Sequence, residues 1–224
     1  PFFRQHFTVY AADSPGLGDS DPPPDVQNAD KIGRVIADGL QQLFPRAEDR
    51  FDLVGFSFGA ILGGHAAQYL DQRLRSFTLV GAGGMGLTRA EGMPMARFRR
   101  DMSHDEFKDL ARNNLGILML CDRQKIDDVA ILMQMLNTTR AVTKSRNISR
   151  DASLARVLPL CPCRISGIWG ELDSTTYPFV HERRELMRRV QPDCRFETIP
   201  DAGHWAMYEQ PEAFNQTLLA QLRP

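Results

Sequence analysis

The chain has 224 residues, 42% of them hydrophobic, and a formal net charge of −1 at pH 7. A chain of this length and composition can bury one sizeable core, so we expect one globular domain that carries an insertion. The near-neutral charge argues against nucleic acid as a partner, and no apolar run approaches the roughly 20 residues needed to cross a bilayer, so no membrane partner is expected either.

Predicted strands and helices alternate through the first 84 residues. An apolar stretch at 7–11 is typical of a buried strand, and the loop at 14–25 is rich in Pro, Gly and Asp. Apolar residues at helical spacing predict a helix over 26–44 that stops at Pro45. The elements expected next are a strand at 51–54, a helix at 60–70 and a strand at 76–80.

The pattern changes between residues 85 and 155, where helical segments rich in Met, Arg and Asp replace the strands. The clearest helices are expected at 105–113 and 127–142. One side of the second helix carries the apolar residues Val129, Ile131, Leu132, Met135 and Leu136. We interpret this part of the chain as a helical cap that is inserted into the domain.

The alternation of strands and helices resumes after the insertion. Strands are expected at 164–169 and 195–199, and helices at 178–190 and 211–222. This order predicts an α/β fold with a mostly parallel, doubly wound sheet that helices cover on both faces. We divide the chain into a core domain, formed by residues 1–84 and 156–224, and the cap at 85–155.

Neither a metal nor a cofactor is expected. Cys161 and Cys163 are separated by one residue, whereas zinc and redox motifs usually have two, and we interpret them as ordinary thiols, like Cys121 and Cys194. The five histidines are scattered along the chain, so they do not form a ligand cluster. The N-terminus lacks the layout of a signal peptide, which favours a cytoplasmic location.

The pentapeptide Gly55-Phe56-Ser57-Phe58-Gly59 lies between a predicted strand and a predicted helix. This is the context of a nucleophile elbow, a sharp turn that exposes a serine hydroxyl. We expect glycine on both sides because a side chain there would collide with the neighbouring strand or helix. The hydroxyl becomes a good nucleophile only if a histidine can take its proton. Ser57 is therefore the candidate nucleophile, and the main-chain amide of Phe58 is the candidate oxyanion-hole donor.

Candidate partners for the serine follow two later strands. Asp173 and His204 each come just past the C-terminal end of a predicted strand. Because the carboxyl ends of parallel strands meet at one edge of a sheet, we expect both side chains to lie near Ser57. His204 would act as the general base, and Asp173 would orient it and stabilise its imidazolium. Glu171 is an alternative acid, but we expect its side chain to point the other way.

The order Ser, Asp, His and the motifs around it resemble the α/β-hydrolase superfamily over almost the whole chain. Residues 10–20 are similar to that family's fourth-strand signature, Asp-x-Pro-Gly-x-Gly-x-Ser. Residues 203–205 and 208–214 resemble its histidine loop and the start of its last helix. The resemblance implies that the earlier strands, and the loop that supplies the second oxyanion-hole donor, are absent from this chain.

Within that superfamily, Trp205 and the Asp-Ser-Asp-Pro-Pro stretch at 19–23 are similar to the meta-cleavage product hydrolases, which split carbon–carbon bonds in vinylogous 1,5-diketones. The resemblance implies a 2-hydroxy-6-oxo-dienoate type substrate. It would be ketonised with the help of His204 and then attacked by water or by Ser57. Phe56 is a departure, because those hydrolases often have Asn immediately before the serine. Relatives are commonly dimers, so the resemblance allows a homodimer.

A carboxylated substrate needs a fixed cation, and arginine offers a bidentate fork. The basic residues at the end of the cap are Arg140, Lys144, Arg146 and Arg150. We prefer Arg146 as the substrate-binding residue, and the alternative is a solvated helix face. Trp205 is expected in the substrate pocket or, alternatively, packed under the cap. Phe56 is expected to form pocket wall or core.

Two other functions stay open. A carboxylesterase or lactonase that acts on a small apolar ester needs only the three side chains and an oxyanion hole. A non-catalytic member of the fold would bind a small molecule in a closed pocket, but it would have no need for all three residues.

Overall fold

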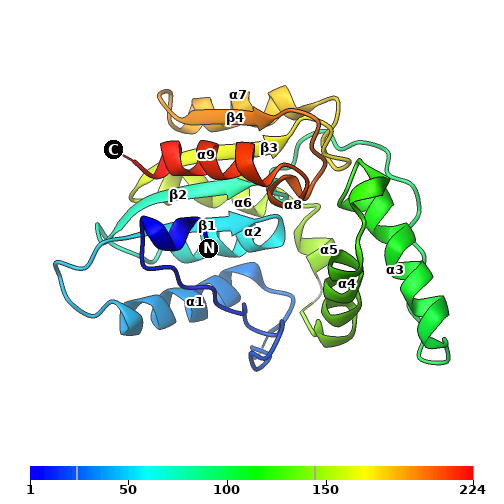
Figure 1. Ribbon diagram of the computed structural model, residues 1–224. Coiled ribbons are helices and arrows are strands. Elements are labelled where there is room, and N and C mark those ends of the chain that lie inside the picture. The colour runs from blue at the N-terminus through cyan, green and yellow to red at the C-terminus, as the bar shows by residue number, and fades with distance from the viewer. Residues whose placement is uncertain (24, 144, 224) are drawn as a thin grey trace.

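The computed structural model describes residues 1–23, 25–143 and 145–223. Its centre is a parallel sheet in which four strands follow the order β1-β2-β3-β4 (Figure 1). The strands are β1 (Phe51–Phe56), β2 (Leu74–Val80), β3 (Arg164–Gly170) and β4 (Arg195–Ile199). Each parallel pair is joined by a crossover that contains helix, as parallel pairing requires. The predicted fold class is confirmed.

Helices cover both faces of the sheet. The helices on one face are α1 (Ala29–Leu43), α2 (Phe58–Ala67), α6 (Ser153–Val157), η3 (Leu158–Leu160) and α7 (Val180–Val190). The other face is covered by α9 (Pro211–Leu222), with the short η1 (Phe3–Gln5) beside it. The predicted closing helix at 211–222 corresponds to α9. The helix predicted over 26–44 begins at Ala29 because the Asn28 side chain caps it by accepting from the Lys31 N–H.

Side chains on β2 alternate between the two cores. Phe77 and Leu79 are fully buried on the side of α1 and α2, while Val80 joins the core under α9. Removing each of these side chains from water is worth about 1.5–3 kcal/mol. Thr78 is also buried, and its hydroxyl lies 2.9 Å from that of Ser166 on β3. The strand is therefore buried on both faces, as in sheets of α/β proteins.

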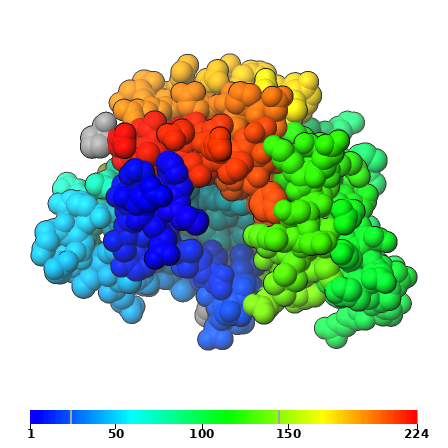
Figure 2. Space-filling view, in the orientation of Figure 1, coloured from blue at the N-terminus to red at the C-terminus, as the bar shows by residue number. Residues whose placement is uncertain are grey.

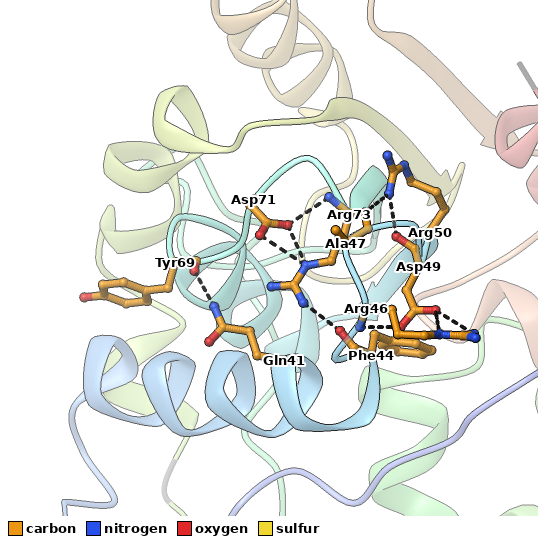
Figure 3. A network of polar contacts seen from close by, with 9 residues as sticks. All are labelled: Gln41, Phe44, Arg46, Ala47, Asp49, Arg50, Tyr69, Asp71 and Arg73. Atoms are coloured by element: carbon orange, nitrogen blue, oxygen red, sulfur yellow. Dashed lines mark hydrogen bonds and ion pairs between the residues drawn. The ribbon is translucent and has the colours of Figure 1, made fainter.

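Polar contacts tie the end of α1 to the loop between α2 and β2 (Figure 3). Arg73 donates to the carbonyl oxygen of Phe44 at 2.7 Å and pairs with Asp71 at 2.8 Å. Gln41, on the last turn of α1, donates to the carbonyl oxygen of Tyr69 at 3.1 Å. These contacts lie at the amino ends of the strands. They hold α1 against α2 and lie away from the carboxyl edge of the sheet.

The prediction of a buried strand at 7–11 is wrong. The segment has no strand in the structure, and Val9 and Tyr10 are 51% and 60% exposed. A strand needs a neighbour for its backbone N–H and C=O groups. Among the described residues, β1 pairs only with β2, so the segment at 7–11 lacks a strand partner. Phe7 instead packs near α9, and the Tyr10 ring contacts that of Phe44 edge-on.

Between β2 and β3 the chain forms helices that lie beyond the carboxyl ends of the strands (Figure 1). They are α3 (His104–Leu118), η2 (Arg123–Lys125), α4 (Asp128–Arg140) and α5 (Ser145–Ile148). A capping box fixes the start of α3, since the Ser103 side chain accepts from the Glu106 N–H and the Glu106 side chain accepts from the Ser103 N–H. In the described part of the chain, no helix is long and apolar enough to cross a membrane.

Only part of the apolar side of α4 is buried. Ile131 is 2% exposed and packs with residues of α3. In contrast, Val129, Leu132 and Leu136 are 58%, 55% and 40% exposed. A helix that packs on one neighbour buries a narrow strip. The apolar residues of α4 span a wider arc than its contact with α3 covers.

Candidate active site

Ser57 lies at the turn where β1 ends and α2 begins. Its φ of 52° and ψ of −111° form a backbone conformation that residues other than glycine rarely adopt. Strain of this kind costs about 1–3 kcal/mol and persists where the surrounding structure determines it. The Ser57 N–H donates to the carbonyl oxygen of Val80 on β2 at 2.8 Å, which anchors the turn to the sheet.

The two glycines that flank the serine have different surroundings. A Cβ at Gly55 would lie 2.5 Å from the Ala60 Cα, so only glycine lets α2 return this close to β1. A Cβ at Gly59 would meet nothing within 4 Å. The expectation of a collision at both positions is therefore wrong for Gly59, because that position on α2 faces open space.

Three side chains that follow three different strands meet at the carboxyl edge of the sheet. His204 Nε2 lies 2.9 Å from Ser57 Oγ, and His204 Nδ1 lies 2.8 Å from a carboxylate oxygen of Asp173. His204 is 4% exposed and Asp173 is fully buried. When Asp173 is ionised, Nδ1 carries the proton that it donates to the carboxylate, so Nε2 can accept the Ser57 hydroxyl. The structure thus brings together the three side chains expected to meet.

The Asp173 carboxylate keeps its charge although it is buried. Burial by itself raises the pKa of Asp173, but the charge of His204, with hydrogen bonds from His204 and Thr175, outweighs burial and holds the pKa below its usual value. The N–H and the hydroxyl of Thr175 both donate to Asp173 at 2.8 Å. Glu171, the alternative acid, is exposed. An ionised Asp173 can stabilise an imidazolium at His204.

Gly81, which directly follows β2, is part of the site although no motif indicated it. Its φ of +53° favours glycine, and a Cβ would lie 3.2 Å from the His204 ring and 3.3 Å from the Asp173 carboxylate. The absence of a side chain lets the histidine and the acid pack against the end of β2. A glycine just past a predicted strand end was the available signal, but glycines are common at such positions.

Phe58 is the first residue of α2, so no carbonyl of the helix accepts from its N–H. The N-terminus of a helix also carries a partial positive charge that favours a negative group. An N–H that follows the nucleophile and has no partner in the helix suits an oxyanion-hole donor. That role for Phe58 stays a prediction.

Phe56 and Trp205 are sequence neighbours of Ser57 and His204, but they pack differently. The centroid of the Phe56 ring lies 5.0 Å from that of His204, with the rings tilted by 45°. Trp205 is 9% exposed, packs in the cluster of α3 and α4, and stacks on Tyr208 with the centroids 5.1 Å apart. This placement corresponds to the packing alternative for Trp205. Substrate contact by either aromatic residue stays a prediction.

The basic residues between positions 140 and 150 are solvent-exposed where the structure describes them. Arg140 pairs with Asp19 at 3.0 Å, and Arg146, in α5, is exposed, as is Arg150. Lys144 lies outside the described residues. Binding of a substrate carboxylate by Arg146 stays a prediction.

A cavity of about 210 Å³ opens beside His204. Its walls are Gly116–Cys121 at the end of α3, Leu172, Ser174, Gly203 and the His204 ring. Figure 2 shows a recess on the face in view, between the N-terminal residues in dark blue and the helices of residues 104–148 in green. Space for a small molecule therefore borders the histidine.

The cysteines lie outside the cluster of Ser57, His204 and Asp173. Burial, with a smaller effect of neighbouring charge, raises the pKa of Cys161 and Cys163 to about 12. Burial also raises the pKa of Cys194. Such thiols are protonated at neutral pH. Within residues 1–23, 25–143 and 145–223, no three His, Cys, Asp or Glu side chains are grouped so that they could hold a metal ion.

Comparison with known proteins gives the family of the chain. A family model described as "Alpha/beta hydrolase family" matches residues 1–217. A curated relative from Comamonas testosteroni, a 2-hydroxy-6-oxononadienedioate/2-hydroxy-6-oxononatrienedioate hydrolase, is 23% identical over 98% of this chain and 78% of its own length. A 2-hydroxy-6-oxo-6-phenylhexa-2,4-dienoate hydrolase from Burkholderia cepacia is 25% identical over the same shares of the two chains.

A solved structure supports the same fold. The meta-cleavage product hydrolase from Pseudomonas fluorescens IP01 superposes with a TM-score of 0.74 at 20% identity, over 99% of this chain and 81% of that one. The resemblance to meta-cleavage product hydrolases that the motifs indicated is confirmed.

Proposed function

Since the chain belongs to the alpha/beta hydrolase family and is a hydrolase, we propose that it is a serine hydrolase in which Ser57, His204 and Asp173 form the catalytic triad. The observation that carries this proposal is the pair of hydrogen-bond contacts on the two nitrogens of His204, 2.9 Å to Ser57 and 2.8 Å to Asp173. A histidine between a serine and a buried carboxylate is the arrangement that activates a hydroxyl.

In the proposed reaction, His204 Nε2 takes the proton of the Ser57 hydroxyl as Oγ attacks a carbonyl carbon of the substrate. Asp173 holds the ring by its Nδ1–H and stabilises the imidazolium without taking the proton. The Phe58 N–H at the start of α2 would donate to the oxyanion that forms. His204 then gives the proton to the leaving group as its bond to the carbonyl carbon breaks, which leaves an acyl group on Ser57. Water, deprotonated by His204, hydrolyses this ester, and the proton returns to Ser57 Oγ.

The substrate class that we propose is a 2-hydroxy-6-oxo-dienoate, whose carbon–carbon bond next to the 6-oxo group is cleaved. Both curated relatives carry names with the 2-hydroxy-6-oxo pattern, and each aligns with 98% of this chain. His204 would also move the proton that converts the dienol into its keto form before the cleavage. We propose that residues 85–155 act as the cap over this substrate, with Trp205, Arg146 and Phe56 as its contacts.

The test follows the loss of visible absorbance of a 2-hydroxy-6-oxo-hexa-2,4-dienoate on mixing with the protein. We expect loss in the wild-type protein and a fall in rate of about 10⁴-fold or more in Ser57→Ala. Ser103→Ala, which removes the hydroxyl that caps α3, serves as a control for loss of a serine elsewhere, on samples shown to be folded by circular dichroism. Equal rates in wild type and Ser57→Ala would contradict the proposed nucleophile.

A small apolar ester is the second candidate substrate. The apolar ring of Phe56 lies against His204, and the cavity beside the histidine has apolar walls that include Ile117, Leu118 and Leu172. Hydrolysis of p-nitrophenyl acetate without loss of the dienoate would favour this candidate. If a fluorophosphonate does not label Ser57 in the folded protein, a non-catalytic binding role replaces both.

A further inference from the structure

Glu209 is a buried carboxylate outside the three residues assigned to the chemistry. It ends α8 (Ala206–Glu209), the short helix that follows the His204 loop, and is 1% exposed. A carboxylate away from water is stable only if hydrogen bonds or a cation replace its hydration. Among the described residues, no Lys or Arg side chain forms an ion pair with the Glu209 carboxylate. Hydrogen bonds must therefore replace its hydration.

Two backbone N–H groups satisfy the Glu209 carboxylate, and they come from different parts of the molecule. One oxygen accepts from the N–H of Gly203 at 2.5 Å, and the other accepts from the N–H of Asp122 at 2.8 Å. Gly203 directly precedes His204, whereas Asp122 lies in the segment between α3 and α4. The carboxylate therefore joins the histidine loop to the helical insertion.

Other contacts also hold the histidine loop against the segment between α3 and α4. The Trp205 N–H donates to the Met119 carbonyl oxygen at 2.7 Å, and the Lys125 ammonium donates to the Glu209 carbonyl oxygen. A Cβ at Gly203 would lie 2.8 Å from the Cys121 nitrogen and 2.9 Å from the Glu209 carboxylate. Residues on both sides of His204 are thus held against residues 119–122.

We propose that Glu209 is a positioning residue for His204: by binding the Gly203 and Asp122 N–H groups together, it sets the imidazole at hydrogen-bond distance from Ser57. The inference rests on the proposed function, because it assigns Glu209 a role through the proposed general base. The carboxylate does not touch the reacting atoms, and it acts on the backbone that carries the histidine.

The decisive variant is Glu209→Gln, which keeps the size of the side chain. An amide has one acceptor oxygen and one NH₂ group, so its NH₂ would face one of the two N–H donors and that contact would be lost. Glu212→Gln is the matched control, because Glu212 is exposed on the first turn of α9 and loses the same charge. Glu209→Asp keeps the carboxylate on a shorter stem.

The measured quantity is kcat for p-nitrophenyl acetate per active site titrated with a fluorophosphonate, on samples shown to be folded by circular dichroism. Displacing a catalytic group by about 1 Å can cost 10²-fold in rate, so we expect Glu209→Gln to lower kcat by about 10- to 100-fold with little change in KM. Glu209→Asp should recover part of the loss, and Glu212→Gln should match wild type. A wild-type kcat per titrated site in folded Glu209→Gln would overturn the proposal.

If Glu209→Gln does not fold, Asp122→Pro carries the test, because it removes one of the two N–H donors at a φ of −90° that proline can adopt. A wild-type kcat in that variant would overturn the proposal. A second readout is independent of activity. It follows the Gly203 and Asp122 N–H groups, which donate to the Glu209 carboxylate. Loss of the carboxylate should speed hydrogen exchange at both N–H groups, as measured by NMR.

The two readouts separate the two proposals. If wild type is not labelled at Ser57, the proposed function fails, and hydrogen exchange at the Gly203 and Asp122 N–H groups then decides whether Glu209 holds the loop. Unchanged exchange at both groups in folded Glu209→Gln would mean that these contacts persist without the carboxylate, which also overturns the inference.

Discussion

The turn at Ser57 and the loop at His204 each end a strand of the same sheet, yet different parts of the chain hold them. The Ser57 turn depends on a close approach between residues five apart, Gly55 and Ala60. The His204 loop depends on residues about 80 positions away, through the hydrogen bond from the Trp205 N–H to Met119.

This difference explains why one half of the site is visible in a short motif and the other is not. A tight strand-to-helix turn needs glycine at a given spacing, so five consecutive residues are enough to predict its geometry. The orientation of the His204 ring results from Asp173, Gly81 and the Glu209 junction, which come from three separate segments. Changes in the turn should therefore act mainly on stability, and changes around the loop mainly on rate.

The largest effect is expected where the support of His204 is removed directly. Asp173→Asn should lower the rate of fluorophosphonate labelling of Ser57 by about 10⁴-fold, because an amide leaves the ring in the wrong tautomer and removes the charge that stabilises imidazolium. Glu171→Gln, an exposed acid two residues earlier, should label at the wild-type rate. Equal losses in both variants would contradict the assignment of Asp173.

A smaller loss is expected from crowding the same ring. Gly81→Ala adds a Cβ about 3.2 Å from the His204 ring at a φ of +53°, so the ring must shift. We expect a labelling rate up to about 100-fold lower. Gly39→Ala is the control, since a Cβ there meets nothing within 4 Å. A normal rate for Gly81→Ala in a folded sample would show that the ring tolerates this crowding.

At the turn, the comparison predicts a change in stability. Gly55→Ala places a Cβ 2.5 Å from the Ala60 Cα and should lower the free energy of unfolding by about 1–3 kcal/mol. Gly59→Ala, which meets no atom within 4 Å, should change it by less than about 1 kcal/mol, in the stabilising direction for a helix position. Urea unfolding of both variants measures these changes. Equal destabilisation of Gly55→Ala and Gly59→Ala would contradict the predicted difference between the two glycines.

The smallest effect is expected in the acid dependence of stability. The pKa of Asp173 is lowered in the folded protein, so its ionisation adds stability that is fully present above the unfolded pKa of about 3.9 and is lost as the pH falls through the lower, folded value. The difference in unfolding free energy between wild type and Asp173→Asn should thus be constant above about pH 5 and shrink below pH 4. A difference independent of pH down to 2 would argue against a lowered pKa.

Local patterns were sufficient for most of the regular structure. Residues 195–199 and 211–222 form β4 and α9 as expected, because apolar spacing and the proline at the start of the helix are local signals. The prediction of a strand at 7–11 was wrong because a strand also requires a partner strand, and no local pattern shows whether one is present. The burial of the apolar side of α4 is likewise not a local property, since the contact with α3 decides how much of that side is buried.

The sequence by itself determined the parallel α/β fold, the sharp turn at Ser57, and the two strand ends that carry Asp173 and His204, because each depends on residues close together in the chain. Only the tertiary structure decided that Gly81 leaves room for the histidine, that Trp205 packs under α3 and α4, and that Glu209 joins the histidine loop to Asp122. These are contacts between segments remote in sequence, and their geometry exists only once the sheet and the helical insertion have packed together.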